Sequence, residues 1–379
     1  MPYGRKLIVD RKCDMLDLLE PAADEIFDNL AELSISAPAI VVFHRDQYLL
    51  NQELVKSWMD RSDLTLILCC PDEGSETIIW HLDHMGLTGC VKAGQLLLIT
   101  GADLPPEYCN LKFQNLCRRT VNSNDPAQCN DTIRKIFEKP IKPYDFLFLN
   151  GRTRRHRKYL LERFEQWGLL SRALWTCLEG WGYYDKVLTV PDSKENLMLN
   201  IRPIQYLPPQ YELPEIRERV NLPLPMTDSF VKHHLFDGVW RDGVAYPAPY
   251  VDTYFSVVTE TVFDGAAYTF LTEKIFKPIM AGHPFIVSAN AGFYKELRSA
   301  GFRTFGHVID ESFDSLDNHQ DRIERLAQSV RDLCNQNLAD FLSASADVCK
   351  YNQQHLIEYV SHGEQEFLHN FFQFLSKHQ

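Results

Sequence analysis

The fold of this chain is decided by three short apolar runs in its first half, APAIVVFH (37–44), LTLILCCP (64–71) and GQLLLITG (94–101). Between them lie two segments whose apolar residues recur at helical spacing, LLNQELVKSWMDR (49–61) and ETIIWHLDHMG (76–86). Buried strands that alternate with helices build a parallel sheet covered by helices on both faces. We therefore predict one α/β domain in residues 1–140.

The second half repeats this pattern after a break. EKPIKPYD (138–145) carries two prolines and is typical of a linker, and the strand FLFLN (146–150) and the helix HRKYLLERFEQWGLL (156–170) follow it. Further along, the pattern predicts the strand 250–261, the helix 270–282, the strand 283–289, the helix 290–301 and a short strand near FRTFG (302–306). The chain is thus predicted to be an α/β protein of two Rossmann-like domains, 1–140 and 141–379, which face each other across a cleft.

Two other stretches complete the outline. The proline-rich stretch 201–225 interrupts the regular pattern and predicts an ordered insertion over one domain face, because proline breaks helices and central strands. From residue 321 onward, apolar residues at helical spacing predict helices that pack back across the domains.

The composition is that of a globular protein. Apolar residues make up 45% of the chain, charged residues 24%, and the net charge is −12. Because this acidic balance repels nucleic acid and anionic lipid, an anionic ligand would need a local basic cluster. No apolar run reaches the ~18 residues that span a bilayer and the N-terminus has no apolar leader, so we expect a cytoplasmic protein that is at most peripheral to a membrane.

The potential metal ligands give little sign of a metal site. The ten cysteines form no C-x-x-C pair and show no zinc-type spacing, which predicts reduced, buried thiols. His81 and His84 share a helix face, but no third ligand accompanies them. No D-x-D-like motif follows a predicted strand. We expect no bound metal.

The segment YFSVVTETVFDGAAYTFLTEKIFKPIMAGHPFIV (254–287) carries the clearest functional pattern. Its first strand ends at Glu260, and a helix opens at Thr272, followed by Glu273, Lys274 and Lys277. A helix N-terminus at the carboxyl edge of a parallel sheet attracts anions, and two lysines three residues apart share one helix face. The lysines can neutralise a diphosphate and a carboxylate can accept hydrogen bonds from ribose, whereas the alternative is an ordinary solvated helix start.

This segment resembles the donor-binding region of the fucosyltransferase-like B-type glycosyltransferases, which have two Rossmann-like domains. The resemblance lies in the residues 255–260, 271–275, 281–282 and 284–286. It implies that Glu273 binds the ribose of the nucleotide-sugar donor, Lys274 its diphosphate, and Glu260 the sugar or the nucleotide, with a GDP-sugar favoured. The run TETVF (259–263) differs from the aromatic-Glu-Asn-Ser run of those enzymes, which leaves the sugar open.

A basic cluster, NGRTRRHRK (150–158), follows the first strand of the second half directly. Guanidinium groups and main-chain N–H groups at a strand-to-helix turn suit a diphosphate. The sequence does not decide among Arg152, Arg154, Arg155 and Arg157. A solvated basic face is the alternative, and nucleic acid is disfavoured because no aromatic residues are interleaved for base stacking.

An inverting transferase also needs a base that takes the proton of the acceptor hydroxyl. The candidates follow the predicted strands of the first half, and they are His44, Arg45, Asp46, Asp72, Glu73 and Asp103. We favour Asp72 or Glu73, although aspartates at such places are often helix caps or loop residues.

The sequence therefore predicts an inverting, metal-independent glycosyltransferase without a cofactor. It would move a hexosyl or fucosyl group from a nucleotide sugar to a glycan or lipid-linked glycan, as in bacterial or viral surface-polysaccharide synthesis. The N-terminal domain would hold the acceptor and the base, and the C-terminal domain the donor. Two alternatives stay open, a transferase that uses a CMP-linked acidic sugar and a non-catalytic binding protein with a degenerate transferase fold.

Overall fold

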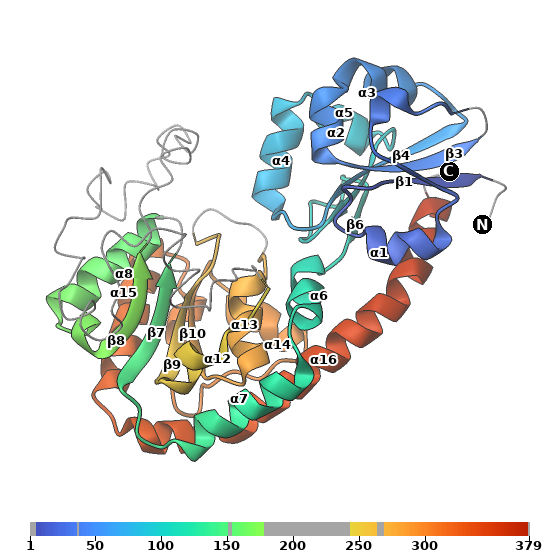
Figure 1. The fold of residues 1–379 in the computed structure, drawn as a ribbon. Coiled ribbons are helices and arrows are strands. Elements are labelled where there is room, and N and C mark those ends of the chain that lie inside the picture. Colours follow the sequence, from blue (N-terminus) through green and yellow to red (C-terminus); the bar gives the residue numbers. More distant parts are fainter. Residues whose placement is uncertain (1–4, 36–37, 151–153, 178–242, 264–268, 378–379) are drawn as a thin grey trace. The chain divides into compact units, whose positions relative to one another are not determined.

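Two parallel sheets organise the chain, which confirms the predicted α/β class (Figure 1). The structure is a computed structural model that describes residues 5–35, 38–150, 154–177, 243–263 and 269–377. The chain divides into unit 1, formed by Met1–Arg118, Ala266–Leu271 and Glu358–Gln379, and unit 2, formed by Arg119–Gly265 and Thr272–Ile357. Each unit contains one of the sheets, as expected for two Rossmann-like domains.

The sheet of unit 1 has six strands in the order β2-β1-β3-β4-β5-β6, all parallel. These strands are β1 (Lys6–Asp10), β2 (Glu25–Phe27), β3 (Ala39–His44), β4 (Leu64–Cys70), β5 (Leu97–Thr100) and β6 (Asn110–Lys112). The helices are α1 (Leu16–Leu19), α2 (Arg45–Leu50), α3 (Gln52–Met59), α4 (Ser75–His84), α5 (Thr88–Lys92) and α6 (Asn115–Asn122), whose last residues belong to unit 2.

Successive residues of β3 and β4 point to opposite faces of this sheet, and both faces are buried. One face packs against α2 to α5 through Tyr48, Val55 and Leu82. The other packs against α1 and the end of α16 (Leu338–Lys377), from which Phe367 and Phe371 enter the core. The last turns of the chain thus complete the core of unit 1 (Figure 1).

The sheet of unit 2 has four parallel strands in the order β10-β9-β7-β8. They are β7 (Tyr144–Asn150), β8 (Ala173–Cys177), β9 (Thr253–Thr259) and β10 (Phe285–Ser288). The helices are α7 (Pro126–Glu138), α8 (Arg155–Gln166), α12 (Pro247–Val251), α13 (Glu273–Ala281), α14 (Phe293–Ser299), α15 (His319–Cys334) and the first part of α16. Helices α8 and α15 lie on one face of this sheet, and α12 and α13 on the other (Figure 1).

Helix α13 ends at Gly282, which adopts a left-handed conformation with φ of 69°. This conformation favours glycine, and a Cβ there would lie 2.3 Å from Cδ1 of Ile133 on α7. The glycine therefore both terminates α13 and lets α7 approach it closely.

One predicted element is wrong. Residues 302–306, predicted as a short strand, belong to no strand. The Arg303 N–H donates to the side chain of Asn352 at 2.8 Å, and the Arg303 carbonyl accepts from the same amide at 2.8 Å. The Phe305 N–H donates to the Glu311 carboxylate at 2.7 Å. Side chains, and not a neighbouring strand, thus form the hydrogen bonds with the main chain of Arg303 and Phe305. The proline-rich stretch 201–225 lies outside the described residues.

Candidate functional site

The sheet of unit 2 reverses its strand order between β7 and β9. The chain adds β8 on one side of β7 and then returns to place β9 and β10 on the other side. In open parallel sheets, ligands bind beyond the carboxyl ends of the strands at such a reversal. Helix α8 begins after β7 and helix α13 begins after β9, so the two predicted donor-binding segments flank this point.

The first turn of α13 carries the acidic and basic residues that the sequence predicts to bind the donor, Glu273 and Lys274. Thr272 caps the helix, and its Oγ1 accepts from the Lys274 N–H at 3.3 Å. The Lys274 Nζ donates to Glu273 Oε1 at 2.7 Å and to Thr272 Oγ1 at 3.3 Å. Burial of Glu273 opposes its charge, but Lys274 and Lys277 outweigh it, and they lower its pKa to about 2. Glu273 is therefore an anion at neutral pH beside two cations.

Glu260 ties together the two ends of the segment between β9 and α13. Its carboxylate is 1% exposed and accepts from Thr272 Oγ1 at 2.5 Å, from the Thr261 N–H at 3.2 Å and from the Thr272 N–H at 3.4 Å. Burial raises the pKa of Glu260, and the charge of Lys274 opposes this effect. In this structure the Glu260 carboxylate thus accepts hydrogen bonds from groups of the protein itself.

The described arginines of the basic cluster after β7 differ in burial. Arg157 is 4% exposed, and its Nη2 donates to the carbonyls of Thr259 at 3.0 Å and of Glu260 at 3.3 Å. Arg154 is partly exposed and Arg155 is exposed, whereas Arg152 lies outside the described residues. The cluster thus reaches the end of β9 through Arg157, while Arg154 and Arg155 face solvent to different degrees.

His156 belongs to the same contact, although the sequence did not indicate its role. Its Nε2 donates to the Glu260 carbonyl at 3.1 Å, and its ring stacks on Phe263 at 5.1 Å between centroids. Burial, together with the charges of Arg157 and Arg154, holds the pKa of His156 well below its usual range. The ring is therefore neutral, which suits a buried donor to a carbonyl.

Arg322 of α15 is a second residue that the sequence analysis missed. Its guanidinium is 1% exposed, lies 4.6 Å from the Phe263 ring centroid, and donates to neutral acceptors. These acceptors are the carbonyls of Phe263, Ala289, Leu316 and Asp317 and the His319 Nδ1, at 2.5 to 3.2 Å. Arg322 thereby joins the segments that follow β9 and β10 to the segment that precedes α15.

The sheet of unit 1 also reverses its order, between β1 and β3. The buried Asp10 at the end of β1 accepts from the His44 N–H at 3.0 Å. The His44 Nε2 lies 3.7 Å from the Asp14 carboxylate, and its Nδ1 lies 3.6 Å from the Asp46 carboxylate. The strand-end candidate His44 thus stands between two carboxylates.

The favoured base candidates, Asp72 and Glu73, follow β4 at the same edge of unit 1. Asp72 accepts from the Asn115 amide at 2.9 Å, and Glu73 pairs with Arg45 at 3.1 Å. Burial raises the pKa of Glu73, and Arg45 opposes the shift. A carboxylate of raised pKa can take up a proton more readily than an exposed one, as a general base requires. Asp103 instead pairs with Lys112 at 2.6 Å.

Comparison with known proteins assigns no relative. No match emerges for this chain among protein-family models, curated proteins or solved structures. Within the described ranges, no helix is long and apolar enough to cross a membrane. Among the same residues, no three His, Cys, Asp or Glu side chains cluster as metal ligands.

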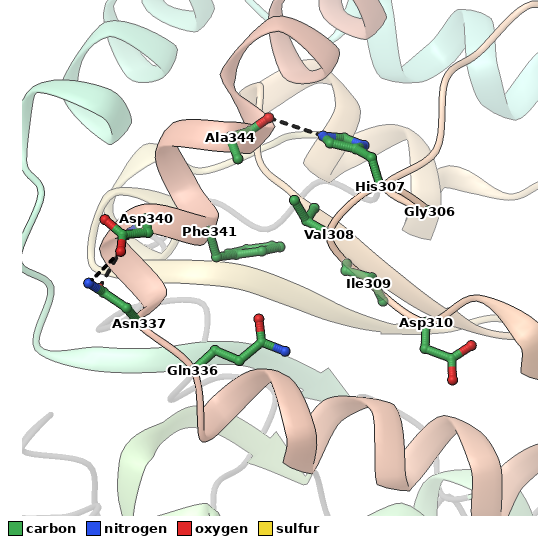
Figure 2. A pocket seen from close by; sticks show the side chains of 10 residues that line it. All are labelled: Gly306, His307, Val308, Ile309, Asp310, Gln336, Asn337, Asp340, Phe341 and Ala344. Atoms are coloured by element: carbon green, nitrogen blue, oxygen red, sulfur yellow. Dashed lines mark hydrogen bonds between the residues drawn. The ribbon is translucent and has the colours of Figure 1, made fainter.

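A hollow of about 630 Å³ lies elsewhere in unit 2, beside the start of α16 (Figure 2). The Asn337 amide donates to Asp340 at 2.7 Å, and the His307 Nε2 donates to the Ala344 carbonyl at 3.1 Å. Its aspartate Asp310 pairs with Arg325. Asn337, Asp340, His307 and Asp310 of this hollow thus bond to other groups of the protein, and none of the predicted site residues lines it.

The low pKa of Glu273 predicts a pH effect on stability. Its contribution is fully present above the pKa of an unfolded glutamate, about 4.3, and is lost as pH falls toward 2. We expect urea unfolding between pH 5 and pH 2.5 to show that Glu273→Gln loses less stability on acidification than the parent, by on the order of 1–3 kcal/mol. The exposed Glu366 of α16 provides the control, Glu366→Gln. Parallel pH curves for Glu273→Gln and the parent would contradict the charge pairing.

Proposed function

We propose that this protein is a metal-independent glycosyltransferase that uses a nucleotide-sugar donor, with a GDP-sugar favoured. The observation that supports the proposal is the contact between two segments that lie about a hundred residues apart in the chain. Arg157 and His156 donate to the carbonyls at the end of β9, and the carboxylate of Glu260 bonds to the cap of α13. A basic cluster and a helix N-terminus thus meet at the strand-order reversal, where nucleotides bind in related architectures.

Each residue of this edge has a role in the proposal. Lys274 and Lys277 stabilise the charge that develops on the departing diphosphate, and Arg154 and Arg155 contribute to the same field. Glu273, held ionised by the two lysines, accepts hydrogen bonds from the ribose hydroxyls. Arg157, His156 and Glu260 hold the segments that carry these groups. Two or more cations supply the charge that a divalent metal supplies in other transferases.

The proposed reaction is a single displacement. The acceptor oxygen forms a bond to the anomeric carbon of the sugar, its proton passes to a carboxylate base, and the bond from that carbon to the diphosphate oxygen breaks. The diphosphate leaves with the bonding electron pair. Glu73, with Asp72 beside it, is the proposed base because burial raises its pKa. The acceptor is a glycan or a lipid-linked glycan, as in surface-polysaccharide synthesis.

A thermal-shift panel tests this proposal. The purified protein is heated with GDP, UDP, CMP and their common sugar conjugates, each with magnesium and with a chelator. A nucleotide at ~100 times its dissociation constant stabilises the folded state by about 2.7 kcal/mol. We expect stabilisation by one diphosphate nucleotide without metal. If no nucleotide stabilises the protein, the donor site is wrong, and a salt-sensitive affinity for RNA would instead favour a binding protein.

A further inference from the structure

Arg45 uses only part of its guanidinium group inside unit 1. Its Nη1 donates to Glu73 Oε1 at 3.1 Å and to His81 Nδ1 at 3.4 Å. Two of the five N–H donors of a guanidinium are thus engaged. Its Nε is buried without an acceptor, and Nη2 has no acceptor among the described residues either. The side chain is 28% exposed and Nη2 is not among the buried atoms, so a ligand can reach this edge of the group.

The place of Arg45 in the sheet suits a ligand. It follows β3 directly, where the sheet of unit 1 reverses its order between β1 and β3. Ligands of open parallel sheets bind beyond the carboxyl ends of the strands at such a reversal. A buried N–H group that lacks an acceptor destabilises a fold, and an oxygen of a ligand would relieve this cost. Because the N–H groups of Nε and Nη2 point along the same edge of the planar group, one ligand can accept from both.

The charges around Arg45 favour a ligand oxygen that carries no charge. The Glu73 carboxylate already lies against the same guanidinium. Two further carboxylates, those of Asp14 and Asp46, lie 3.7 and 3.6 Å from the ring nitrogens of His44, the residue before Arg45. A carboxylate or phosphate on the open edge would be repelled by these groups. A hydroxyl or amide oxygen accepts from a guanidinium without this repulsion.

An exposed tryptophan extends this surface. Trp80 of α4 is 48% exposed, and its ring centroid lies 5.0 Å from that of His81, the residue that accepts from Arg45. Burial lowers the pKa of His81, and the charges of Arg45 and His84 add to this effect, so the ring is neutral and can accept. An aromatic ring beside hydrogen-bond donors suits a sugar, whose C–H groups pack on the ring while its oxygens bond to the donors.

We infer that Arg45 binds the acceptor, and that this acceptor is an uncharged sugar. A hydroxyl or acetamido oxygen of the sugar accepts from Nη2 and Nε, while Nη1 holds the carboxylate of Glu73. Trp80 packs against a further part of the same glycan. All three residues belong to unit 1. That the bound sugar receives a glycosyl group, with its hydroxyl proton passing to Glu73, rests on the proposed function, whereas the sugar site itself does not.

Sugar binding to the full chain, without nucleotide, tests the site. The probes are the methyl glycosides of glucose, galactose, mannose and N-acetylglucosamine, and methyl glucuronide as the charged counterpart. We expect at least one neutral glycoside to shift the Nε–H nuclear magnetic resonance signal of Arg45, and the glucuronide to bind at least about tenfold more weakly than that glycoside. If no neutral glycoside shifts this signal, or if the glucuronide binds as tightly, the inference is overturned.

Arg45→Lys keeps the charge but removes the planar edge that carries Nε and Nη2. It should weaken binding of the neutral glycoside by about tenfold or more, because it loses hydrogen bonds to a charged group. Arg61→Lys is the matched control, since Arg61 belongs to the same unit and pairs with Asp63 near the surface. Its affinity should equal that of the parent. Unchanged affinity in Arg45→Lys would overturn the inference.

A second variant keeps the test decisive if Arg45→Lys fails to fold. Trp80→Ala changes an exposed side chain and should leave the fold intact. We expect it to weaken binding of the neutral glycoside by about fivefold, because the sugar loses its aromatic contact. The control is Leu50→Ala, which removes another exposed apolar side chain of unit 1. Equal affinities in the two variants would contradict the sugar site.

Arg45→Met tests the link to Glu73. Burial raises the pKa of Glu73, Arg45 and His44 lower it, and Asp72 raises it. Without the guanidinium, the pKa of Glu73 should rise further, which a titration of its carboxyl carbon by nuclear magnetic resonance measures. A base acts only when it is deprotonated, so transfer should then be lost at a higher pH than in the parent as the solution is acidified. An unchanged pKa of Glu73 would contradict its contact with Arg45.

The outcomes separate this inference from the proposed function. If a neutral glycoside binds at Arg45 but no nucleotide stabilises the protein, the proposed transferase fails and the sugar site stands. If a nucleotide stabilises the protein but no glycoside binds at Arg45, the donor site stands and the inference fails.

Discussion

Arg322→Met is expected to lower the free energy of unfolding by about 3–5 kcal/mol, because it removes the donor of several buried or partly buried main-chain carbonyls. Methionine keeps most of the aliphatic stem, so packing changes little. The change leaves four main-chain carbonyls without the guanidinium that now donates to them. Each buried acceptor that loses its donor costs about 1–3 kcal/mol before relaxation. Urea unfolding followed by circular dichroism measures the loss.

The same helix offers a matched control. Arg325 lies three residues further along α15, is 44% exposed and pairs with Asp310 at the surface. Arg325→Met should change stability by no more than about 1 kcal/mol, because exposed ion pairs contribute little. Equal losses in the two variants would show that helix propensity or net charge, and not the buried guanidinium, determines the result.

Lys274→Met is the second change with a large expected effect, in this case on activity. We expect sugar transfer to slow by about 10²–10³-fold, because in the proposed reaction the variant loses the cation that stabilises the charge of the leaving diphosphate. If the affinity for the nucleotide falls 100-fold, stabilisation at a concentration that gave about 2.7 kcal/mol falls to about 0.4 kcal/mol. Initial turnover rates and the thermal shift with the same nucleotide measure the two effects.

Lys295→Met on α14 is the control for Lys274→Met, since Lys295 is exposed and lies in the same unit. Its turnover and nucleotide response should equal those of the parent. The fold is tested separately by urea unfolding at neutral pH, because Lys274 also pairs with Glu273 and its loss is expected to lower stability. If the Lys274→Met protein turns over the donor at the parental rate, Lys274 does not stabilise the leaving group.

The sequence predicts the long buried strands well and the short ones poorly. The strands β3, β4 and β9 are rich in apolar residues and buried along almost their whole length, as is typical of strands covered on both faces. The edge strands β2 and β6 have three residues each, too few to show a period. The residues 302–306 look like a strand because Phe302 and Phe305 are buried, but side chains satisfy their main chain. An apolar pattern therefore indicates that side chains are buried, but it does not indicate which groups form hydrogen bonds with their main chain.

The sequence predicted individual residues of the candidate site, but not the contacts that join them. Motif spacing pointed to Thr272, Glu273 and Lys274, yet it gave no sign that Arg157 turns inward to carbonyls. A signal for Arg322 was present, because it lies four residues before Leu326 and eight before Val330, on the apolar stripe of its helix. A charged residue on such a stripe is seldom buried without partners.

Helix α16 has a consequence for synthesis of the protein on the ribosome. The first segment of unit 1 ends at Arg118, but Phe367 and Phe371 of its core are made roughly 250 residues later. At about 5–20 residues per second, roughly 12–50 s separate the synthesis of Arg118 from that of Phe367. During this interval one face of the first sheet is covered by α1 but lacks the side chains of α16, and the uncovered part is open to chaperones or to aggregation. The first unit to be translated is therefore the last whose core can close.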